Sequence, residues 1–239
     1  VLDVPLLGDL ERAIDALAAE EQLTGVVITG RAPTSFAAGA DIDALAGIDE
    51  VALAEELARF GQGLFQRIAE LGPRTVAAVG GPVPGGAYEL ALACDAIVLA
   101  DHPSTRIGLP ETRLGILPGW GGSQRLPRRV GVPRALSAIL SGKLHVPSQA
   151  LRLGLADRLT PPEYLLRVAR DIALGRETLR AHQRGVWKWL IDANPLALAV
   201  IAKRARAQLE RETQGKYPAP ARALELVVAA PRTPLATGL

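Results

Sequence analysis

The chain has very little of several residue types, and each scarcity excludes a class of protein. Cys94 is the only cysteine, so no disulfide can form within the chain, and we expect a reducing, cytoplasmic setting. No uninterrupted apolar run approaches the roughly 18 residues that span a membrane, and no signal peptide opens the chain. Methionine is absent and the chain begins at Val1, so we expect a fragment of a longer protein.

A large excess of charge of one sign is also lacking. The formal net charge of the 239 residues is only +2, and the basic residues, mostly arginines, are scattered among acids. This pattern forms no stripe of the kind that binds nucleic acid, so we expect no nucleic-acid partner, whereas phosphate-bearing small molecules stay compatible with it. A hydrophobic share of 49% and a charged share of 22% are ordinary for a globular domain.

Hydrophobic periodicity indicates an α/β protein. Helical spacing of apolar residues and short β-branched runs alternate along the first three quarters of the chain. The predicted strands cover residues 24–30, 74–81 and 96–101, and the predicted helices cover 5–22, 49–71, 86–93, 133–141, 147–153 and 161–175. Strand, loop and helix in this order favour a mostly parallel sheet.

The C-terminal quarter has a different pattern. Residues 177–214 are predicted to form a long arginine-rich helical stretch with Trp187 and Trp189, and residues 215–227 a second, amphipathic helix. We therefore predict a core over residues 1–176 and a helical region over 177–239. This region could pack over the core, over a further domain or against another copy of the chain, and the sequence alone does not separate these alternatives.

The stretch "GGPVPGGAYELALACD" (80–95) runs from a glycine-rich turn into an apolar helix. Such a turn exposes backbone amides at the helix N-terminus, where they can stabilise a developing anion. Glu89 lies on the first helical turn among leucines and alanines. It is either a catalytic carboxylate or a residue that complements the helix dipole, and this stretch alone leaves both open.

Two further stretches could complete a site. In "SFAAGADI" (35–42), small residues leave a loop backbone bare for a second N–H donor, although Asp41 could simply cap the next helix. In "IGLPETRLGILPGWGG" (107–122), Glu111 follows a proline, as capping residues do, but its neighbours are apolar. Two carboxylates that face one cavity would provide general acid–base chemistry, with burial raising a pKa.

Other sequence patterns give weaker evidence for a functional site. "GGSQR" lacks the final glycine of a hydrolase elbow around Ser123, and the three histidines have no metal-ligand spacing, so no metal site is expected. Cys94 is interpreted as core packing, and Trp120 either lines a pocket or fills space.

Taken together, these motifs resemble the crotonase family, the enoyl-CoA hydratase/isomerase superfamily. "SFAAGADI", "GGAYELALACD", "GLPETRLGILPGWGGSQRLPR" and "SGKLHVPSQALRLGLADRL" occur in the order that the family has, over most of the chain. The resemblance implies a spiral of ββα units with a helical C-terminal region, and often trimers. "ETQGKYPAPARALELV" resembles the segment after the hydratase region of multifunctional fatty-acid oxidation enzymes. Those enzymes append a dehydrogenase region and pair with a thiolase, so either a homo-oligomer or these partners are implied.

The resemblance also implies a role for individual residues. Ala40 and Gly86 match the positions whose N–H groups form the oxyanion hole for a thioester oxygen. Glu89 matches the glutamate that activates water for attack on Cβ, and Glu111 matches the one that delivers or removes the proton at Cα. A thioester enolate needs two preorganised donors, and syn addition of water needs both carboxyls on one face.

The remaining matches concern coenzyme A. Ala38, Asp41 and Ile42 match the loop that receives its adenine end, and coenzyme A is then part of an acyl-CoA substrate. No metal or redox cofactor is implied. The chain departs from the family pattern at Gly80, where asparagine is usual, at Ala87, which replaces a glycine, and at the bulky Tyr88. We expect Ala87 and Tyr88 to reshape the acyl pocket.

Three functions are compatible with these residues. The favoured one is the reversible hydration of a trans-2-enoyl-CoA in fatty-acid β-oxidation. A Δ3-Δ2 enoyl-CoA isomerase, which shuttles one proton, is the nearest alternative. A non-catalytic acyl-CoA-binding or assembly module is the third, and it would gain if replacing Glu89 and Glu111 by glutamine changed no cellular phenotype.

Overall fold

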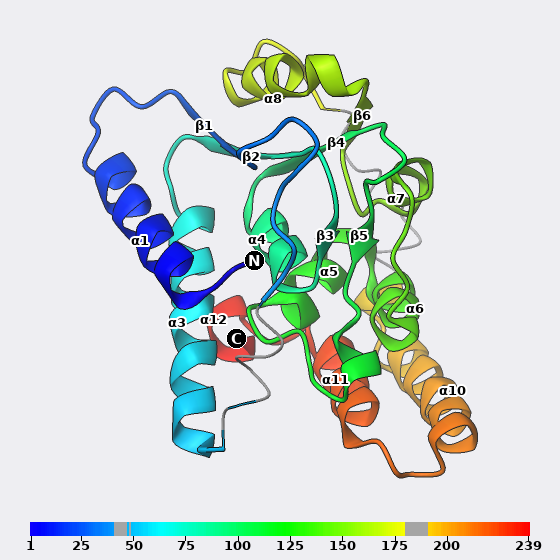
Figure 1. Ribbon diagram of the computed structural model, residues 1–239. Coiled ribbons are helices and arrows are strands. Elements are labelled where there is room, and N and C mark those ends of the chain that lie inside the picture. Colours follow the sequence, from blue (N-terminus) through cyan, green and yellow to red (C-terminus); the bar gives the residue numbers. More distant parts are fainter. Residues whose placement is uncertain (41–46, 48, 180–190) are drawn as a thin grey trace.

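The computed structural model of the chain describes residues 1–40, 47, 49–179 and 191–239 and is shown in Figure 1. The helices and strands, in chain order, are α1 (Val4–Ala18), β1 (Gly25–Thr29), α3 (Val51–Ala69), β2 (Arg74–Val79), β3 (Val83–Pro84), α4 (Gly86–Ala93), β4 (Ala96–Ala100), β5 (Ile107–Gly108), the 3₁₀ turn η1 (Glu111–Leu114), α5 (Gly122–Val130), α6 (Val132–Ser141), α7 (Pro147–Leu153), β6 (Arg158–Thr160), the 3₁₀ turn η2 (Pro162–Tyr164), α8 (Leu165–Ala173), α10 (Pro195–Thr213), α11 (Pro218–Ala229) and α12 (Leu235–Gly238).

The main sheet is parallel throughout, as the alternation of strands and helices predicts. Its strand order is β1-β2-β4-β6, and β3 and β5 form a second, two-stranded parallel sheet. The predicted strands 24–30, 74–81 and 96–101 correspond to β1, β2 and β4, whereas the short β3, β5 and β6 carry too few residues to show a pattern in the sequence. The mixed α/β class is therefore confirmed.

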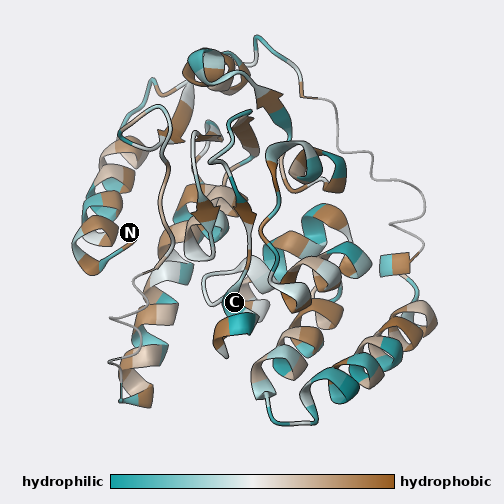
Figure 2. Ribbon diagram, turned by 45° about the vertical axis from the view of Figure 1, so that its right-hand side comes forward, coloured by the Kyte–Doolittle hydropathy of each residue, from teal (hydrophilic) through white to brown (hydrophobic). Residues whose placement is uncertain are grey.

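The two faces of the main sheet pack against different layers, because successive side chains along a strand point to opposite faces. Val76, Ala78 and Val98 face α8, which lies across the top of the sheet in Figure 1. Ala77 and Ile97 face the principal core, which also holds the buried residues of α3, α4, α5 and α6. Figure 2 shows the strands of this sheet as predominantly brown, which is expected for strands that are covered on both faces.

The segment between β2 and α4 is shaped by close backbone approach. A Cβ atom at Gly80 would collide with the carbonyl oxygen of Pro33, and one at Gly81 with that of Thr34. The N–H of Gly80 also donates to the carbonyl of Ser35, at 3.3 Å. Glycine at position 80 therefore allows the loop after β1 to lie directly against the turn that leads to α4.

The helical stretch expected over 177–214 is partly wrong. Residues 177–179 are not helical, residues 191–192 are, and after a break at 193–194 α10 begins at Pro195, where proline suits the first helical position. The side chain of Asn194 caps it by accepting hydrogen bonds from the N–H groups of Leu196 and Ala197, at 2.9 and 3.3 Å. Residues 180–190, with Trp187 and Trp189, lie outside the described residues.

The C-terminal helices cover part of the core. α11 packs against α5 and α6, and α10 packs on α11. Leu224 and Val227 of α11 are buried in the same apolar cluster as the residues of α4. Of the alternatives that the sequence leaves open, packing over the core is thus observed for α11, while the boundary at residue 176 stays a prediction.

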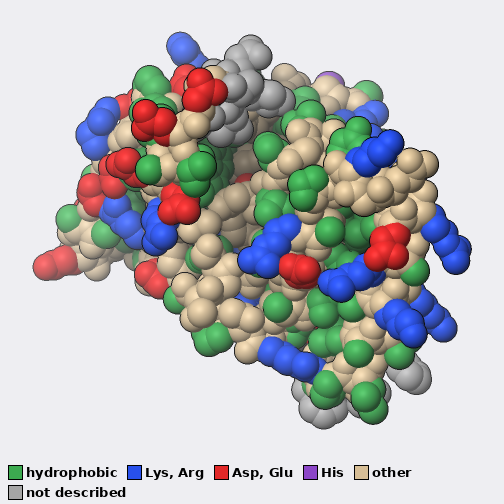
Figure 3. Space-filling view, turned by 90° about the horizontal axis from the view of Figure 1, so that it is seen from below, with side chains coloured by type: hydrophobic (Ala, Val, Ile, Leu, Met, Phe, Trp, Pro, Cys, Tyr) green, Lys and Arg blue, Asp and Glu red, His purple; other side chains and the backbone are tan. Residues whose placement is uncertain are grey.

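Two properties of the surface follow. No helix among residues 1–40, 49–179 and 191–239 is long and apolar enough to cross a membrane. On the underside of the molecule, shown in Figure 3, acidic and basic side chains both occur, and neither sign covers the face.

Candidate active site

A cavity of about 420 Å³ brings together the residues that the sequence singles out. Ala38, Ala40, Gly86, Glu89 and Glu111 all line it, as predicted. Most of its remaining wall is apolar and comes from α3 and from residues 110–120, which include η1. These residues are Ala54, Leu57, Ala58, Pro110, Leu114, Ile116, Leu117 and Trp120. The predicted coenzyme A positions Asp41 and Ile42 lie outside the described residues.

The loop that carries Ala40 is held against the turn before α4. Gly39 has φ +89°, which favours glycine, and a Cβ there would lie 2.9 Å from the carbonyl oxygen of Pro84. The N–H of Leu2 donates to the carbonyl of Gly39, at 2.8 Å, and so ties the loop to the start of the chain. This contact places Ala40 beside the same cavity as Gly86.

The turn before α4 presents an amide to the cavity. Gly85 has φ +57°, and its N–H donates to the carbonyl of Gly108 at 2.9 Å. A Cβ at Gly85 would lie 3.1 Å from Oε1 of Glu111, so only glycine fits here without strain. Gly86 is the first residue of α4, and its N–H therefore has no acceptor within the helix. It can donate to the oxygen of a ligand.

Glu89 is buried, with 2% of its surface exposed, and two backbone amides hold it. Its Oε1 accepts hydrogen bonds from the N–H of Trp120 at 2.9 Å and of Gly122 at 2.7 Å. Burial raises the pKa of Glu89 above the ordinary glutamate value, and these two amides together with the charge of Arg125 oppose that rise. Both amides favour the ionised carboxylate.

Glu111 lies across the cavity in a different environment. It is 7% exposed, and neither of its carboxyl oxygens has a hydrogen-bond partner within the described part of the chain. Burial raises the pKa of Glu111, and the nearby charge of Glu89 raises it further. An unpartnered buried carboxyl with an anionic neighbour is stabilised in its protonated form. The two glutamates thus differ in how strongly their surroundings favour the protonated form.

Arg125 lies behind Glu89 and is itself buried, with 7% of its surface exposed. Its guanidinium donates to Oε1 of Gln66 at 2.9 Å, while its Nε has no partner among the residues described. The positive charge lowers the pKa of Glu89, and the charge of Glu89 in turn stabilises the buried cation. Arg125 therefore opposes, together with the amides, the rise that burial causes in the pKa of Glu89.

The sequence reasoning missed the residues that hold Glu89. Trp120 and Gly122 donate through backbone N–H groups, which every residue except proline has, so residue type does not identify them as donors. Arg125 acts through its charge from a helix for which the sequence predicted no role in the site. The available signal was "GWGG" directly before α5, because glycines at a helix start free amides for an anion. Of the two alternatives for Trp120, lining a pocket is the one observed.

The expectation that Ala87 and Tyr88 reshape the acyl pocket is wrong. Both residues are fully buried in the principal core, and neither lines the cavity. The hydroxyl of Tyr88 donates to the carbonyl of Leu155 at 2.9 Å, so the ring points away from Glu89. The side chains of successive residues on a helix point in directions about 100° apart, so Tyr88 and Glu89 face different sides of α4.

No group of three or more acidic, histidine or cysteine side chains able to hold a metal ion occurs among residues 1–40, 49–179 and 191–239. Cys94 is buried, and its Sγ donates to the carbonyl of Leu90 at 3.7 Å, which agrees with core packing.

Two curated relatives match most of the chain. The fatty acid oxidation complex subunit alpha of Aliivibrio fischeri is 44% identical over 211 residues, which are 87% of this chain and 30% of that protein. The subunit of the same name from Idiomarina loihiensis is 41% identical over 208 residues, or 86% of this chain and 29% of that protein. The chain therefore spans about three tenths of the length of these relatives.

Solved structures share the fold. An enoyl-CoA hydratase from Bacillus anthracis has a TM-score of 0.68 and 29% identity, over 94% of this chain and 80% of that one. A human mitochondrial delta3-delta2-enoyl-CoA isomerase has a TM-score of 0.69 and 26% identity, over 97% of this chain and 86% of that one. The family model described as enoyl-CoA hydratase/isomerase matches residues 2–225. With the crotonase fold, two buried glutamates and two backbone amides at one cavity, the chain belongs to the enoyl-CoA hydratase/isomerase family.

Proposed function

We propose that the chain is an enoyl-CoA hydratase of fatty-acid β-oxidation, which adds water reversibly to a trans-2-enoyl-CoA and yields a 3-hydroxyacyl-CoA. The observation that carries the proposal is the contrast between Glu89 and Glu111. One buried carboxyl accepts two amide hydrogen bonds, and the other has no partner in the described residues. Hydration needs both a base and an acid on one side of the double bond, and this pair supplies both.

The backbone amides of Ala40 and Gly86 act as the oxyanion hole. Addition at Cβ moves negative charge onto the thioester oxygen, and two donors fixed in advance stabilise that charge with no reorganisation. Gly86 also lies at the N-terminus of α4, whose dipole favours an anion. The second donor comes from the loop that Gly39 places against Pro84.

Glu89 acts as the general base and Glu111 as the general acid. Because Oε1 of Glu89 is occupied by the amides of Trp120 and Gly122, its Oε2 is the oxygen left to accept a proton from water. The water oxygen bonds to Cβ, the π electrons move to Cα and the thioester, and the proton of Glu111 is delivered to Cα. Glu89 ends protonated and Glu111 ionised, so a proton must pass between them, through solvent or product exchange, before the next turnover.

Coenzyme A is part of the substrate in this proposal. Ala38 lines the cavity and belongs to the loop assigned to the adenine end, together with Asp41 and Ile42. The proposed reaction is redox-neutral, and the charges it develops are handled by glutamates and amides. We therefore propose that it uses no metal or redox cofactor.

The proposal extends to the larger protein. The curated relatives are named as alpha subunits of a fatty acid oxidation complex. We propose that this chain is the hydratase region of such a subunit, acting beside a dehydrogenase region and a thiolase subunit rather than as a self-sufficient homo-oligomer. Sequencing the uninterrupted gene tests this, and an encoded product without a dinucleotide-binding region would contradict it.

An isomerase is the second candidate. The similarity to the human delta3-delta2-enoyl-CoA isomerase is as strong as the similarity to the hydratase, so the fold does not favour either. Isomerisation moves a single proton between two carbons and needs only one carboxylate. The hydratase is preferred because the site holds two buried glutamates in opposite environments.

The experiment uses purified protein with crotonyl-CoA and with a longer trans-2-enoyl-CoA. We expect the absorbance of the conjugated thioester to fall as water adds, and a 3-enoyl-CoA to react at least about a hundredfold more slowly, because one acid–base group contributes a factor of this order. Conversion of the 3-enoyl-CoA alone would establish the isomerase instead. No reaction with either substrate by folded protein would leave the acyl-CoA-binding module.

A further inference from the structure

The indole side chain of Trp120, unlike its backbone N–H, has no part in the proposed chemistry. Its indole ring lies between α3 and α4, at two glycines that make room for it. A Cβ at Gly61 would collide with the ring, and one at Gly86 would lie 2.5 Å from its Cζ3. The ring of Phe65 meets it edge-on, with centroids 5.5 Å apart. The side chain of Gln62 donates to the carbonyl of Gly119 at 2.8 Å and fixes the preceding residue to α3.

The cavity follows one face of α3 from solvent towards the core. Ala54, Leu57 and Ala58 line it at helical spacing, and burial increases along the helix, from exposed Ala54 to half-buried Leu57 and Ala58. The same face continues to Gly61 and Phe65, both buried. Trp120 covers this face at Gly61, so the lining of the cavity ends there.

On the opposite wall of the cavity, burial of the side chains also increases from solvent towards the core. Leu114 and Ile116 are exposed, with 52% and 42% of their surface accessible, and Leu117 and Trp120 are partly buried. Both walls are apolar, and the only titratable side chains that line the cavity among the described residues are the two glutamates. The walls therefore suit an alkyl chain that runs inward from the reacting carbons.

We propose that the indole of Trp120 closes the inner end of the acyl channel and sets the longest acyl chain that the site accepts. The proposal rests on the proposed function, since it concerns the acyl chain of that substrate. Each methylene buried in front of Trp120 gains about fourfold in affinity. A longer chain must displace the ring from Gly61, Gly86 and Phe65, or leave its end in water, and then gains nothing.

Displacing Trp120 would also disturb catalysis. The N–H of the same residue holds Oε1 of Glu89, at 2.9 Å. A chain that pushes the ring therefore strains the hydrogen bond that keeps the base in place. We expect substrates longer than the limit to lose kcat as well as to stop gaining affinity.

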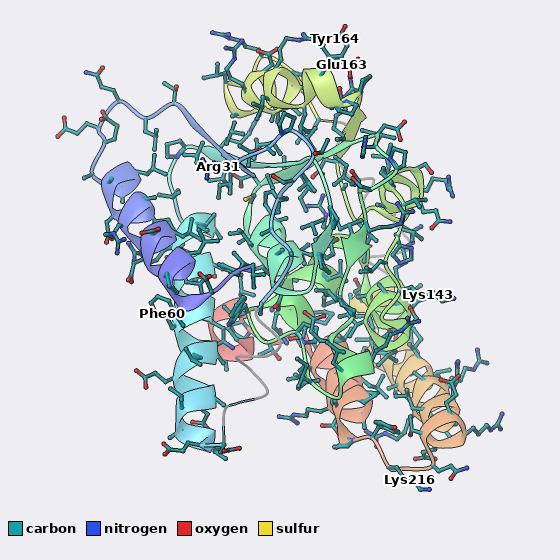
Figure 4. The ribbon with its side chains drawn as sticks, viewed as in Figure 1. Arg31, Phe60, Lys143, Glu163, Tyr164 and Lys216 are labelled. Carbon is teal, nitrogen blue, oxygen red and sulfur yellow. The ribbon has the colours of Figure 1, made fainter. Side chains whose placement is uncertain are left out.

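The test measures binding separately from turnover. Dissociation constants of saturated acyl-CoAs, from butanoyl- to hexadecanoyl-CoA, are measured by titration calorimetry for the wild type and three variants. In Trp120→Ala the space behind the ring is opened, and in Trp120→Phe it is opened partly. Phe60→Ala is the matched control, since Phe60 is an aromatic residue of α3 (labelled in Figure 4) that packs on the core without lining the cavity.

We expect the wild-type affinity to rise with chain length and then to stop rising. In Trp120→Ala the stop should move to longer chains, with at least about a tenfold gain for the first chains beyond the wild-type limit. Trp120→Phe should move it less, and Phe60→Ala not at all. Circular dichroism checks that each variant is folded, and Trp120→Phe keeps the test decisive if Trp120→Ala does not fold.

Other outcomes would overturn the inference. The first is a wild-type affinity that keeps rising with acyl-chain length. The second is an affinity that stops rising at the wild-type chain length in both Trp120 variants. The third is a shift of that chain length in Phe60→Ala as large as the shift in Trp120→Ala. Binding with a movable stop but without turnover of enoyl-CoAs would uphold the channel and contradict the hydratase. Failure of the folded wild type to bind any acyl-CoA would contradict both.

Discussion

The two sides of the cavity present the same side chain in opposite environments. On the α4 side, Glu89 sits in the first turn of a helix and accepts hydrogen bonds from two amides, those of Trp120 just before α5 and of Gly122 at its first position. On the η1 side, Glu111 sits in a single 3₁₀ turn, and its oxygens have no partner in the described structure. The comparison teaches that neighbours rather than residue type decide how readily each carboxyl ionises.

The difference between the environments of Glu89 and Glu111 has three physical sources. Amide donors and a helix N-terminus stabilise the Glu89 carboxylate, and the cation of Arg125 adds to them. Glu111 has no such cation beside it and accepts no amide from another residue in the described structure, and it faces an anion instead. Burial raises both pKa values, so it is the unequal compensation that separates the two groups.

Removing either carboxyl should have the largest effect. We expect Glu89→Gln and Glu111→Gln each to lower kcat by ~10²–10⁴-fold with little change in KM, because each removes a proton transfer and keeps the shape of the site. Glu163→Gln, an exposed glutamate at the top of the molecule in Figure 4, is the matched control and should retain full activity. Steady-state hydration of crotonyl-CoA measures all three, and retained activity in Glu111→Gln would remove the acid from the account.

The stability of the protein should depend on pH through Glu111. Its pKa is raised in the folded state, so the stability it contributes is present below the ordinary glutamate pKa and is lost as the pH rises through the raised value. Glu111→Gln cannot ionise and avoids that loss. We expect it to match the wild type near pH 4 and to exceed it near pH 9 by at least about 1.4 kcal/mol, the equivalent of one pKa unit.

Urea unfolding at the two pH values measures this difference. The same measurement on Glu89→Gln sharpens the comparison, because the Glu89 carboxylate keeps its two amides and the gain at high pH should be smaller. An equal or larger gain in Glu89→Gln would mean that the two sides of the cavity do not differ as described.

Arg125 should set the acidic limb of the pH profile. Replacing it by methionine removes the cation that favours the Glu89 carboxylate, so the pKa of Glu89 should rise. The low-pH fall of kcat/KM should then move to higher pH by about one unit. Arg125→Lys keeps the charge and should leave the limb in place. A limb that stays fixed in Arg125→Met would show that the amides alone tune the base.

Tyr88 should give the smallest effect, since it neighbours Glu89 in sequence but faces the core. Tyr88→Phe removes the hydrogen bond to the carbonyl of Leu155 and should cost about 1–2 kcal/mol of stability. Hydration kinetics and the preference for acyl length should not change. Altered kinetics would restore the earlier expectation that Tyr88 shapes the pocket.

Much of the fold was predictable because its signals are local. The glycine turn followed by an apolar helix predicted α4 with its observed bounds, Gly86–Ala93, and the β-branched runs predicted β1, β2 and β4. The break before α10 was missed, because the helical composition of the stretch outweighed the cap signal of Asn194 and Pro195.

The lining of the cavity was predictable at four of its residues, but the electrostatics of the cavity were not. Motif order identified Glu89, Glu111, Ala40 and Gly86, and all four line the cavity. The difference in environment between the two glutamates depends on the amide of Gly122 and on other contacts from distant segments. The N–H of Gly122 donates to Glu89 across a separation of 33 residues, and a backbone donor is not marked by any residue type. Such a contact is therefore seen only in the folded chain.

The most direct test of the central claim is infrared spectroscopy of the substrate-free protein at neutral pH. A protonated carboxyl has a C=O stretch that ionised carboxylates lack, and exposed acids are ionised under these conditions. Burial raises the pKa of Glu89 to about 7 and that of Glu111 to about 8, so the account predicts such a band in the wild type and a greater loss of it in Glu111→Gln than in Glu89→Gln. A band that persists in Glu111→Gln and disappears in Glu89→Gln would contradict the assignment of base and acid.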